Sequence, residues 1–199
     1  MVGLNEDLLP LQKNYPMTLS FPRLALISVF FTLFLVGCKK EKTLIVGHDN
    51  RIEITLPYLL TESFTLHEQA VIQYQNLLQE LYVIVLEEPK DEVLHFLETD
   101  EAVSNFSADF DGYARLLNEN MQFRIQFDSI SEMTDTKING LNAKRQTFYG
   151  DVKGVNAYYE VALVEGKKHY YQILTWTLQS QKKEHEERMK KILASFKEY

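Results

Sequence analysis

The chain contains a single cysteine, Cys38, among its 199 residues. One cysteine cannot form a disulfide within the chain, so the fold must be held together by its hydrophobic core. Hydrophobic residues make up 45% of the sequence, which is enough to build such a core. Common catalytic signatures are also missing, since there is no G-x-S-x-G motif, no P-loop and no dinucleotide-binding fingerprint. We therefore expect a protein that is not an enzyme and has no cofactor.

An excess of positive charge is absent as well, because the formal net charge is −7 at pH 7. Nucleic-acid binding depends mainly on Lys and Arg side chains that neutralise phosphates. An acidic chain is therefore not expected to bind nucleic acid, or to recognise anionic lipid headgroups through a basic patch. The sequence also contains no internal repeat and no low-complexity segment.

No apolar run is long enough to remain as a membrane span, which takes about 20 residues. The run from Leu24 to Val36 has 13 residues and is interrupted only by Ser28 and Thr32. Arg23 precedes it and supplies a positive charge. A short apolar core behind a positive residue is typical of a secretory signal peptide.

The end of this run resembles the lipobox of bacterial lipoproteins. Leu35, Val36 and Gly37 stand before Cys38 in the order that this motif requires. The resemblance implies that Cys38 is lipidated through a thioether, that the chain is cut before it, and that the new N-terminus is acylated, for example with palmitate. Several acyl chains anchor a protein firmly, whereas one chain holds it only marginally. An ordinary signal peptide, or a buried strand with a chance cysteine, is the alternative.

These features divide the chain into three segments. We expect residues 1–37 to be the signal peptide, with Met17 as the true start, because the residues before Met17 fit no signal pattern. Residues 38–50 are predicted to form a lipidated tether. Residues 51–199 are predicted to form one folded domain, a size that suits a single core.

The mature chain would keep 199 − 37 = 162 residues and the same net charge, because the removed segment has two acidic and two basic residues. Lys39, rather than Asp, follows Cys38, and by the usual lipoprotein sorting rule this favours the outer membrane. Lys40 and Glu41 resemble surface-export signals only weakly. Both the periplasmic face and the cell surface therefore stay open as locations.

The hydrophobic pattern predicts strands and helices in separate blocks. Strands are expected over residues 51–57, 70–76, 81–87, 123–127, 144–152, 155–164 and 169–178. The last two form a hairpin across the short loop Glu165–Lys168. Helices are expected over residues 90–97, after an N-cap at Ser107, and over residues 181–197. This order predicts an α+β fold, a mostly antiparallel β-sheet sandwiched by helices.

The arrangement resembles the PsbP-like superfamily over residues 51–197. The segments that carry the resemblance are Ile52–Pro57, Ile72–Asn76, Glu80–Val85, the long hairpin and the terminal Ile192–Phe196. The resemblance implies an antiparallel sheet between helices and a role as a small interaction module. It supplies no functional residue, because no local motif matches a known binding surface of the family.

Two short motifs resemble metal or catalytic sites but are incomplete. His67-Glu68 begins like a zinc-protease motif, with Val71 where the second histidine must bind, so we expect no metal there. Asp109 and Asp111 resemble the start of a calcium loop, which would also need a glutamate at its twelfth position. Acidic residues at this point are better explained as the start of a helix, where they interact favourably with the helix dipole.

Four tyrosines in the long hairpin are candidates for an interaction surface: Tyr158, Tyr159, Tyr170 and Tyr171. Alternation along a strand puts the members of each pair on opposite faces, so one of each could reach a partner. The alternative is that all of them pack under helices. Asp128-Ser129-Ile130 also resembles a short O-glycosylation acceptor.

Together these observations predict a non-catalytic, lipid-anchored protein of the cell envelope. Its expected partners are the membrane, through the lipid on Cys38, and another envelope protein. A different class of function is also open, in which a pocket between sheet and helices carries an apolar small molecule.

Overall fold

The computed structural model describes residues 41–199 except residues 125 and 153. The segments that precede Glu41, including Met17, Leu35, Val36, Gly37 and Cys38, lie outside the described residues. The signal peptide and the lipidation site therefore stay predictions from the sequence.

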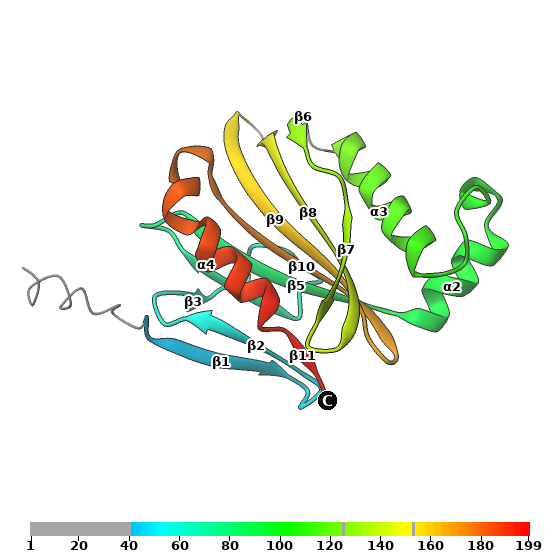
Figure 1. Cartoon of the computed structure of the whole chain (residues 1–199), viewed down its shortest axis with the longest axis horizontal. Coiled ribbons are helices and arrows are strands. Elements are labelled where there is room, and N and C mark those ends of the chain that lie inside the picture. Colours follow the sequence, from blue (N-terminus) through cyan, green and yellow to red (C-terminus); the bar gives the residue numbers. More distant parts are fainter. Residues whose placement is uncertain (1–40, 125, 153) are drawn as a thin grey trace, which may run out of the picture. The chain divides into compact units, whose positions relative to one another are not determined.

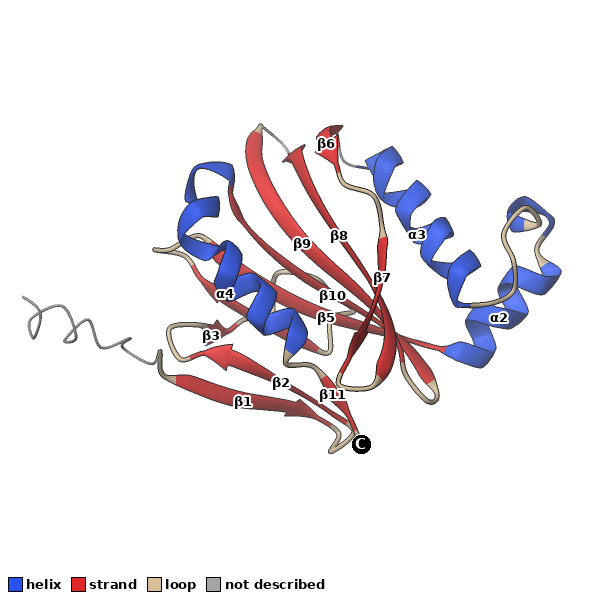
Figure 2. Ribbon diagram, viewed as in Figure 1, coloured by secondary structure: helices blue, strands red, loops and turns tan. Residues whose placement is uncertain are grey.

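Most of the described chain is strand, as Figure 2 shows. The strands are β1 (Thr43–His48), β2 (Ile52–Pro57), β3 (Thr61–Glu62), β4 (Ile72–Asn76), β5 (Leu81–Pro89), β6 (Gln126–Ile130), β7 (Thr134–Ile138), β8 (Leu141–Val152), β9 (Val155–Glu165), β10 (His169–Leu178) and β11 (Lys197–Glu198). The helices are α2 (Lys90–Thr99), α3 (Phe110–Arg124) and α4 (Lys182–Ala194), with short 3₁₀ turns at Glu101–Val103 and Gln179–Gln181.

The strands form two sheets in which every pairing is antiparallel. The large sheet has the order β3-β4-β5-β10-β9-β8-β6, and β7 pairs with β8. The small sheet has the order β1-β2-β11. The predicted hairpin forms β9 and β10, and the nearly continuous apolar segment 82–86 lies in β5, a strand paired on both sides, as expected for a buried strand.

Helix α4 and the small sheet cover one face of the large sheet (Figure 1). The apolar side of α4 is buried there, and it is formed by His185, Met189, Ile192 and Leu193, with Phe196 just beyond the helix. These are the residues that the helical pattern places on the inner side. They pack with Ile52, Ile54 and Leu56 of β2 and with the inward residues of β5, β9 and β10.

Helices α2 and α3 pack against the other face of the large sheet. Residues at alternate positions of β9, namely Ala157, Tyr159, Val161 and Leu163, contact Ala114 and Leu117 of α3 on this side. Tyr170 of β10 packs with Leu97 of α2 and Tyr113 of α3. The predicted α+β sheet between helices is therefore confirmed. Residues 41–199 form one compact unit that contains both core layers, so we treat this segment as a domain that folds by itself.

The structure corrects the expected boundaries at several places. The predicted tether over residues 38–50 is too long, because residues 43–48 form β1 and pair with β2 along their whole length. Residues 123–127 are not one strand, because α3 continues to Arg124 and β6 begins at Gln126. Strands β7 and β11 were not predicted from the sequence. Both lie at edges, where a strand is exposed and has a weak hydrophobic alternation.

The start of α3 also differs from the prediction. Asp109, rather than Ser107, caps the helix, because its carboxylate accepts the backbone N–H of Gly112 at 2.8 Å. Ser107 donates its hydroxyl to the same carboxylate at 2.7 Å. These bonds to the charged form lower the pKa of Asp109. The carboxylate therefore has a structural role at the helix start, in agreement with the capping interpretation.

Candidate functional site

A cleft of about 590 Å³ lies between α3 and the strands β5 and β10 of the large sheet. This volume is within the range of pockets that hold small molecules, roughly 300–1,000 Å³. The cleft is lined by His67, Gln69, Ile84, Leu86, Glu87, Glu88, Leu117, Asn120, Met121, Gln172 and Leu174. Its lining is apolar over most of the floor and polar at one end.

The alternation of β5 and β10 builds the floor. Ile84 and Leu86 of β5 and Leu174 of β10 point to the α3 side, while Val85 and Ile173 point into the core under α4. Helix α3 supplies the wall through Leu117 and Met121. A space therefore remains where the helix ends and the apolar face of β5 continues.

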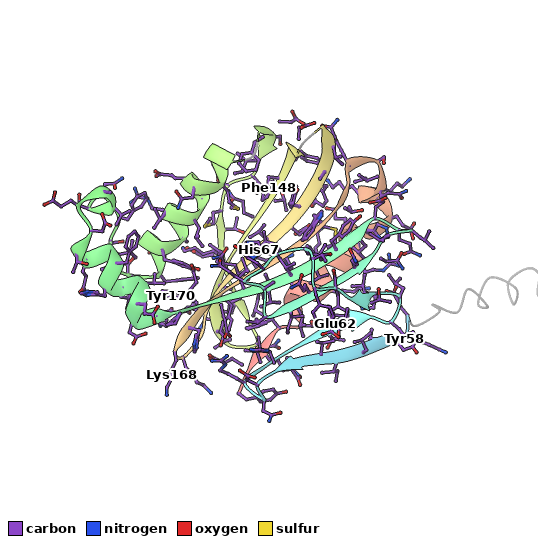
Figure 3. The ribbon with its side chains drawn as sticks, turned by 180° about the vertical axis from the view of Figure 1, so that it is seen from behind. Tyr58, Glu62, His67, Phe148, Lys168 and Tyr170 are labelled. Carbon is purple, nitrogen blue, oxygen red and sulfur yellow. The ribbon has the colours of Figure 1, made fainter. Side chains whose placement is uncertain are left out.

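A loop before β4 supplies the rim that faces α3. The side chain of Gln73 holds this loop in place, since its Oε1 accepts the backbone N–H groups of Leu66 and His67 at 2.9 and 3.3 Å. Its amide donates to the carbonyl of His67 at 3.1 Å. Figure 3 shows the molecule from behind, with His67 in front of the strands of the large sheet. The anchored loop fixes His67 and Gln69 at the edge of the cleft.

The polar end of the cleft is a cluster of Glu88, Tyr113 and Gln172. The hydroxyl of Tyr113 donates to Oε2 of Glu88, and Nε2 of Gln172 donates to the same oxygen at 3.1 Å. Gln172 also donates to the Tyr113 hydroxyl at 3.1 Å. Burial, followed by the adjacent Glu88, raises the pKa of Tyr113 well above its usual value, so this hydroxyl keeps its proton.

The second carboxylate oxygen of Glu88 is left for a ligand. Among residues 41–199, no hydrogen bond reaches Oε1 of Glu88, and no Lys or Arg forms a salt bridge with this carboxylate. The neighbouring Glu87 differs, because Arg51 binds it through two bonds of 2.7 and 3.0 Å. Glu88 therefore offers a carboxylate oxygen without a protein partner to a donor in the cleft.

The apolar floor continues into a row of aromatic rings across the large sheet. Tyr82 of β5 stacks on Trp176 of β10 at 5.1 Å between ring centroids, and Trp176 lies 6.2 Å from Tyr159 of β9. Tyr159 in turn stacks on Phe148 of β8 at 4.4 Å. A second hollow of about 280 Å³ lies over Tyr82, Tyr159 and Trp176. The apolar surface thus extends along β5 and β10 beyond the cleft itself.

The four candidate tyrosines of the hairpin are buried, with 2%, 9%, 1% and 0% of Tyr158, Tyr159, Tyr170 and Tyr171 exposed. Tyr158 donates to the buried carboxylate of Glu160 at 2.6 Å, and Tyr171 donates to Glu198 at 3.0 Å. These side chains therefore do not form the exposed interaction surface considered from the sequence. Tyr158 and Tyr171 pack in the core on the α4 side and Tyr170 packs under α2 and α3, while Tyr159 packs between Phe148 and Trp176 beside the second hollow.

The other motifs singled out in the sequence do not form a metal site or a reactive group in the cleft. Within the residues that the structure describes, no three His, Cys, Asp or Glu side chains lie close enough to hold a metal ion. Nδ1 of His67 accepts the backbone N–H of Gln69 at 3.2 Å, which fits a role in shaping the loop. Ser129 is exposed on β6, so its position would admit the glycosylation that the sequence suggests.

The residues that matter most for the cleft were missed by sequence reasoning. Glu88 of β5 and Gln172 of β10 are each the one polar residue on an otherwise apolar strand face. A polar residue at such a position is the sequence signal that could have pointed to the cleft. Its meaning depends on the pairing of β5 with β10, in which Glu88 lies opposite Tyr170, a residue 170 − 88 = 82 positions later in the chain. The hydrogen bond from the Tyr113 hydroxyl to Glu88 was not predicted either.

No model of a known protein family matches the sequence, and no curated protein matches it. Among solved structures, the fold is similar to that of LpqN of Mycobacterium tuberculosis, a protein involved in cell envelope biogenesis. The sequences are 10% identical, the match covers 78% of this chain and 89% of LpqN, and the TM-score is 0.50.

The chain is also similar to the cyanobacterial PsbP (CyanoP) of Synechocystis sp. PCC 6803, with 12% identity, 82% of this chain and 96% of that chain covered, and a TM-score of 0.49. A protein of unknown function from Pseudomonas aeruginosa matches at 11% identity, with 77% and 94% covered and a TM-score of 0.46. Similarity at these identities concerns the fold alone. The fold is α+β, as the sequence predicts, and it is similar to that of LpqN.

Proposed function

We propose that this chain is a non-catalytic, lipid-anchored binding protein of the cell envelope whose cleft takes an amphipathic small molecule. The observation that carries the proposal is the cleft of about 590 Å³ with an apolar floor and one uncompensated carboxylate, Glu88, at its end. Pockets of this kind bind mainly through apolar contact and use a few polar groups to orient the ligand.

The lining predicts the class of ligand. Leu86, Leu117 and Leu174 favour an aliphatic or aromatic body, which gains about 25 cal/mol for each Å² of apolar surface removed from water. Glu88 favours a head that donates hydrogen bonds, and a protonated amine would add a charge-assisted bond. An anionic head, by contrast, would lie beside this carboxylate without a compensating Lys or Arg among the lining residues.

A binding role fits the cleft better than catalysis. The lining residues include no Ser, Thr, Cys or Lys, and of the other residue types that can act as nucleophiles, Glu87 is bound by Arg51 and Nδ1 of His67 accepts a backbone N–H. The Tyr113 hydroxyl keeps its proton, because burial and the adjacent Glu88 raise its pKa, so no phenolate forms that could act as a base. Glu88, Tyr113 and Gln172 thus suit recognition of a donor group rather than turnover.

The envelope location and the anchor rest on the sequence. The lipobox Leu35-Val36-Gly37 and the lone Cys38 support lipidation, and Lys39 supports sorting to the outer membrane. Within residues 41–199, none of the helices is both long and apolar enough to cross a bilayer. The similarity of fold to LpqN, a protein involved in cell envelope biogenesis, is in keeping with this location.

A protein partner is the second candidate, and one observation favours it. Phe64, in the loop that carries His67, is 79% exposed, which is unusual for a phenylalanine side chain. An envelope protein that inserts an apolar side chain into the cleft would contact this loop as well. The two candidates differ in what fills the cleft.

Isothermal titration of the 41–199 domain with dodecylamine and with dodecanoic acid, below their micelle concentrations, tests the proposal. We expect dodecylamine to bind more tightly, and Glu88→Gln to remove that preference by weakening dodecylamine about tenfold or more, as expected for loss of a charged hydrogen bond. Equal binding of both probes, or no binding of either, would contradict a small-molecule role of this kind. A protein partner would then be sought by crosslinking in intact membranes.

A further inference from the structure

Three large apolar side chains are exposed at one end of the domain. Leu77 and Leu78, in the turn between β4 and β5, are 64% and 97% exposed, and Tyr58, in the turn after β2, is 69% exposed. The two turns are joined, because Nδ2 of Asn76 donates to the carbonyl of Leu59 at 2.8 Å. Oδ1 of Asn76 accepts the backbone N–H of Gln79 at 2.9 Å, so the leucine turn is held in a defined shape.

The described chain begins at this same end. The backbone N–H of Tyr58 donates to the carbonyl of Lys42 at 2.9 Å. Figure 3 shows Tyr58 next to the point where the described ribbon starts. Strand β1 follows at once from Thr43, so little chain separates the fold from Cys38.

A second set of hydrogen bonds connects the leucine turn to the chain start through α4. The carbonyl of Gln79 bonds to Nε2 of His185 at 2.9 Å, and Nδ1 of His185 bonds to Arg188 at 2.5 Å. Arg188 then donates to the carboxylate of Glu41 at 2.8 Å. The exposed leucines and the start of the domain are therefore parts of one connected end of the molecule.

Covalent geometry limits how far this end can be from the lipidated residue. Cys38 precedes Glu41 by three residues. An extended chain spans at most about 3.6 Å per residue, so the separation is about 11 Å or less. The headgroups add roughly 10–15 Å in total to the hydrocarbon core, or about 5–8 Å on each side, so this end of the domain must lie at or close to the headgroup layer.

We propose that Tyr58, Leu77 and Leu78 form a membrane-facing end that inserts into the bilayer to which Cys38 is anchored. The proposal rests on the lipid anchor of the proposed function and adds an orientation to it. The leucines would enter the acyl boundary, and Tyr58 would lie at the headgroup level, where tyrosine is enriched. The cleft between α3 and β5 would then have a fixed position relative to the membrane.

Apolar insertion, rather than charge attraction, holds this end to the membrane. The charged groups here are mixed: Glu41 is paired with Arg188, Glu80 accepts the Tyr82 hydroxyl at 2.6 Å, and Lys42 and Glu62 are exposed. Lys39, Lys40 and Lys42 follow Cys38 closely and would be attracted to anionic lipid at low salt. Salt screens this attraction but does not weaken apolar insertion, so docking should persist at high salt.

The test uses the full-length lipidated protein in vesicles of phosphatidylethanolamine and phosphatidylglycerol. Cys38 is consumed by the lipid, so Leu78→Cys provides one free thiol for an environment-sensitive fluorophore. Phe96→Cys is the matched control, because Phe96 is a 43% exposed apolar residue on α2, which lies away from the chain start in Figure 1. Spin-labelled lipids then report whether each fluorophore is within the bilayer.

We expect a blue-shifted emission and strong quenching at position 78, unchanged by salt, and a water-like emission at position 96. In a Leu77→Ser variant the ratio of docked to undocked protein should fall about tenfold, as expected for removing one buried leucine. Water-like emission at position 78 in a protein whose intact mass confirms the acyl chains would overturn the docking and leave the anchor standing. Shielding at position 78 in native membranes but not in vesicles would point to a protein partner and would also overturn it. A mass without acyl chains would instead refute the anchor.

Discussion

The hydroxyl of Tyr113, on α3, donates a hydrogen bond to the carboxylate of Glu88, the residue before the last of β5. This bond connects the helical wall of the cleft to its sheet floor. Gln172 supports both groups from β10, so three elements distant in sequence meet at the polar end of the cleft. The position of α3, and with it the width of the cleft, depends on this junction.

Replacement of Tyr113 by phenylalanine tests the junction. Tyr113→Phe keeps the ring, which stacks on Tyr170 at 4.5 Å, and removes one of the two donors to Glu88. The free energy of unfolding should fall by about 1–3 kcal/mol, the usual cost of leaving a buried polar group short of a partner. Urea unfolding of the 41–199 domain measures the change.

Tyr170→Phe is the matched control for that experiment. Tyr170 is 1% exposed, and its hydroxyl makes no hydrogen bond to any residue that the structure describes. Its loss should change stability by no more than about 0.5 kcal/mol. Equal losses in the two variants would mean that the bond to Glu88 contributes nothing specific.

Filling the cleft should abolish binding without unfolding the domain. Leu174→Trp places a larger apolar side chain over the floor of a cavity that has about 590 Å³ of free volume. Dodecylamine binding should fall below detection, while the free energy of unfolding stays within about 1 kcal/mol of that of the parent. Ile45→Trp, at a 67% exposed position on β1, is the control and should bind normally. Unchanged binding by Leu174→Trp would place the ligand elsewhere.

His185 predicts a specific dependence of stability on pH. It is 1% exposed, its Nε2 bonds to the carbonyl of Gln79, and its Nδ1 faces the guanidinium of Arg188, so the neutral ring fits the site. Burial, and then the Arg188 charge, lower its pKa below the usual value of about 6.5. The unfolded chain therefore binds the proton more readily than the folded chain.

The sign follows from this difference. The contribution of neutral His185 to the free energy of unfolding is fully present above pH 6.5 and is lost as the pH falls through 6.5 towards the lowered pKa. For this one group the free energy of unfolding changes by at most about 1.4 kcal/mol per pH unit. Urea midpoints measured from pH 7.5 to 5.5 should decrease. His185→Gln should flatten this decrease, and an identical slope in the variant would rule out His185 as its cause.

Replacing the lipidated residue tests the anchor separately from the fold. Cys38→Ser in the full-length chain removes the thiol that accepts the lipid, so the protein should leave the detergent phase on phase separation of solubilised membranes. The unsubstituted protein should remain in that phase. Partitioning that is the same for both would show that the membrane association, if any, does not depend on Cys38.

Much of the fold could be predicted because its signals are local. The alternation in residues 155–164 and 169–178 and the stripe from His185 to Phe196 each depend on a few neighbouring residues, and the structure has them as expected. Strand β1 was missed because its apolar residues Leu44, Ile45 and Val46 are consecutive and do not alternate with polar ones, and because it follows a charged segment. The extent of the tether was misjudged for the same reason.

The cleft could not be predicted, because it exists only where no helix or loop covers the apolar face of β5 and β10. Ile84, Leu86 and Leu174 look like ordinary core residues in the sequence, and only the positions of α3 and of the 63–71 loop leave a cleft over them. The hydroxyl of Tyr113 likewise has a partner only after β5 and β10 have paired. Interactions of this kind depend on the three-dimensional arrangement and leave little trace in a local pattern.

The small sheet joins the two ends of the described chain. Strand β2 has β1 on one side and β11 on the other, and the last residue, Tyr199, donates its backbone N–H to the carbonyl of Arg51 at 2.9 Å. A chain that emerges N-terminus first would therefore hold one side of β2 unpaired until β11 has been made. Loss of Lys197 and Glu198 would leave this side of β2 open to pairing with other chains. The two residues of β11 thus protect β2 from pairing with another molecule.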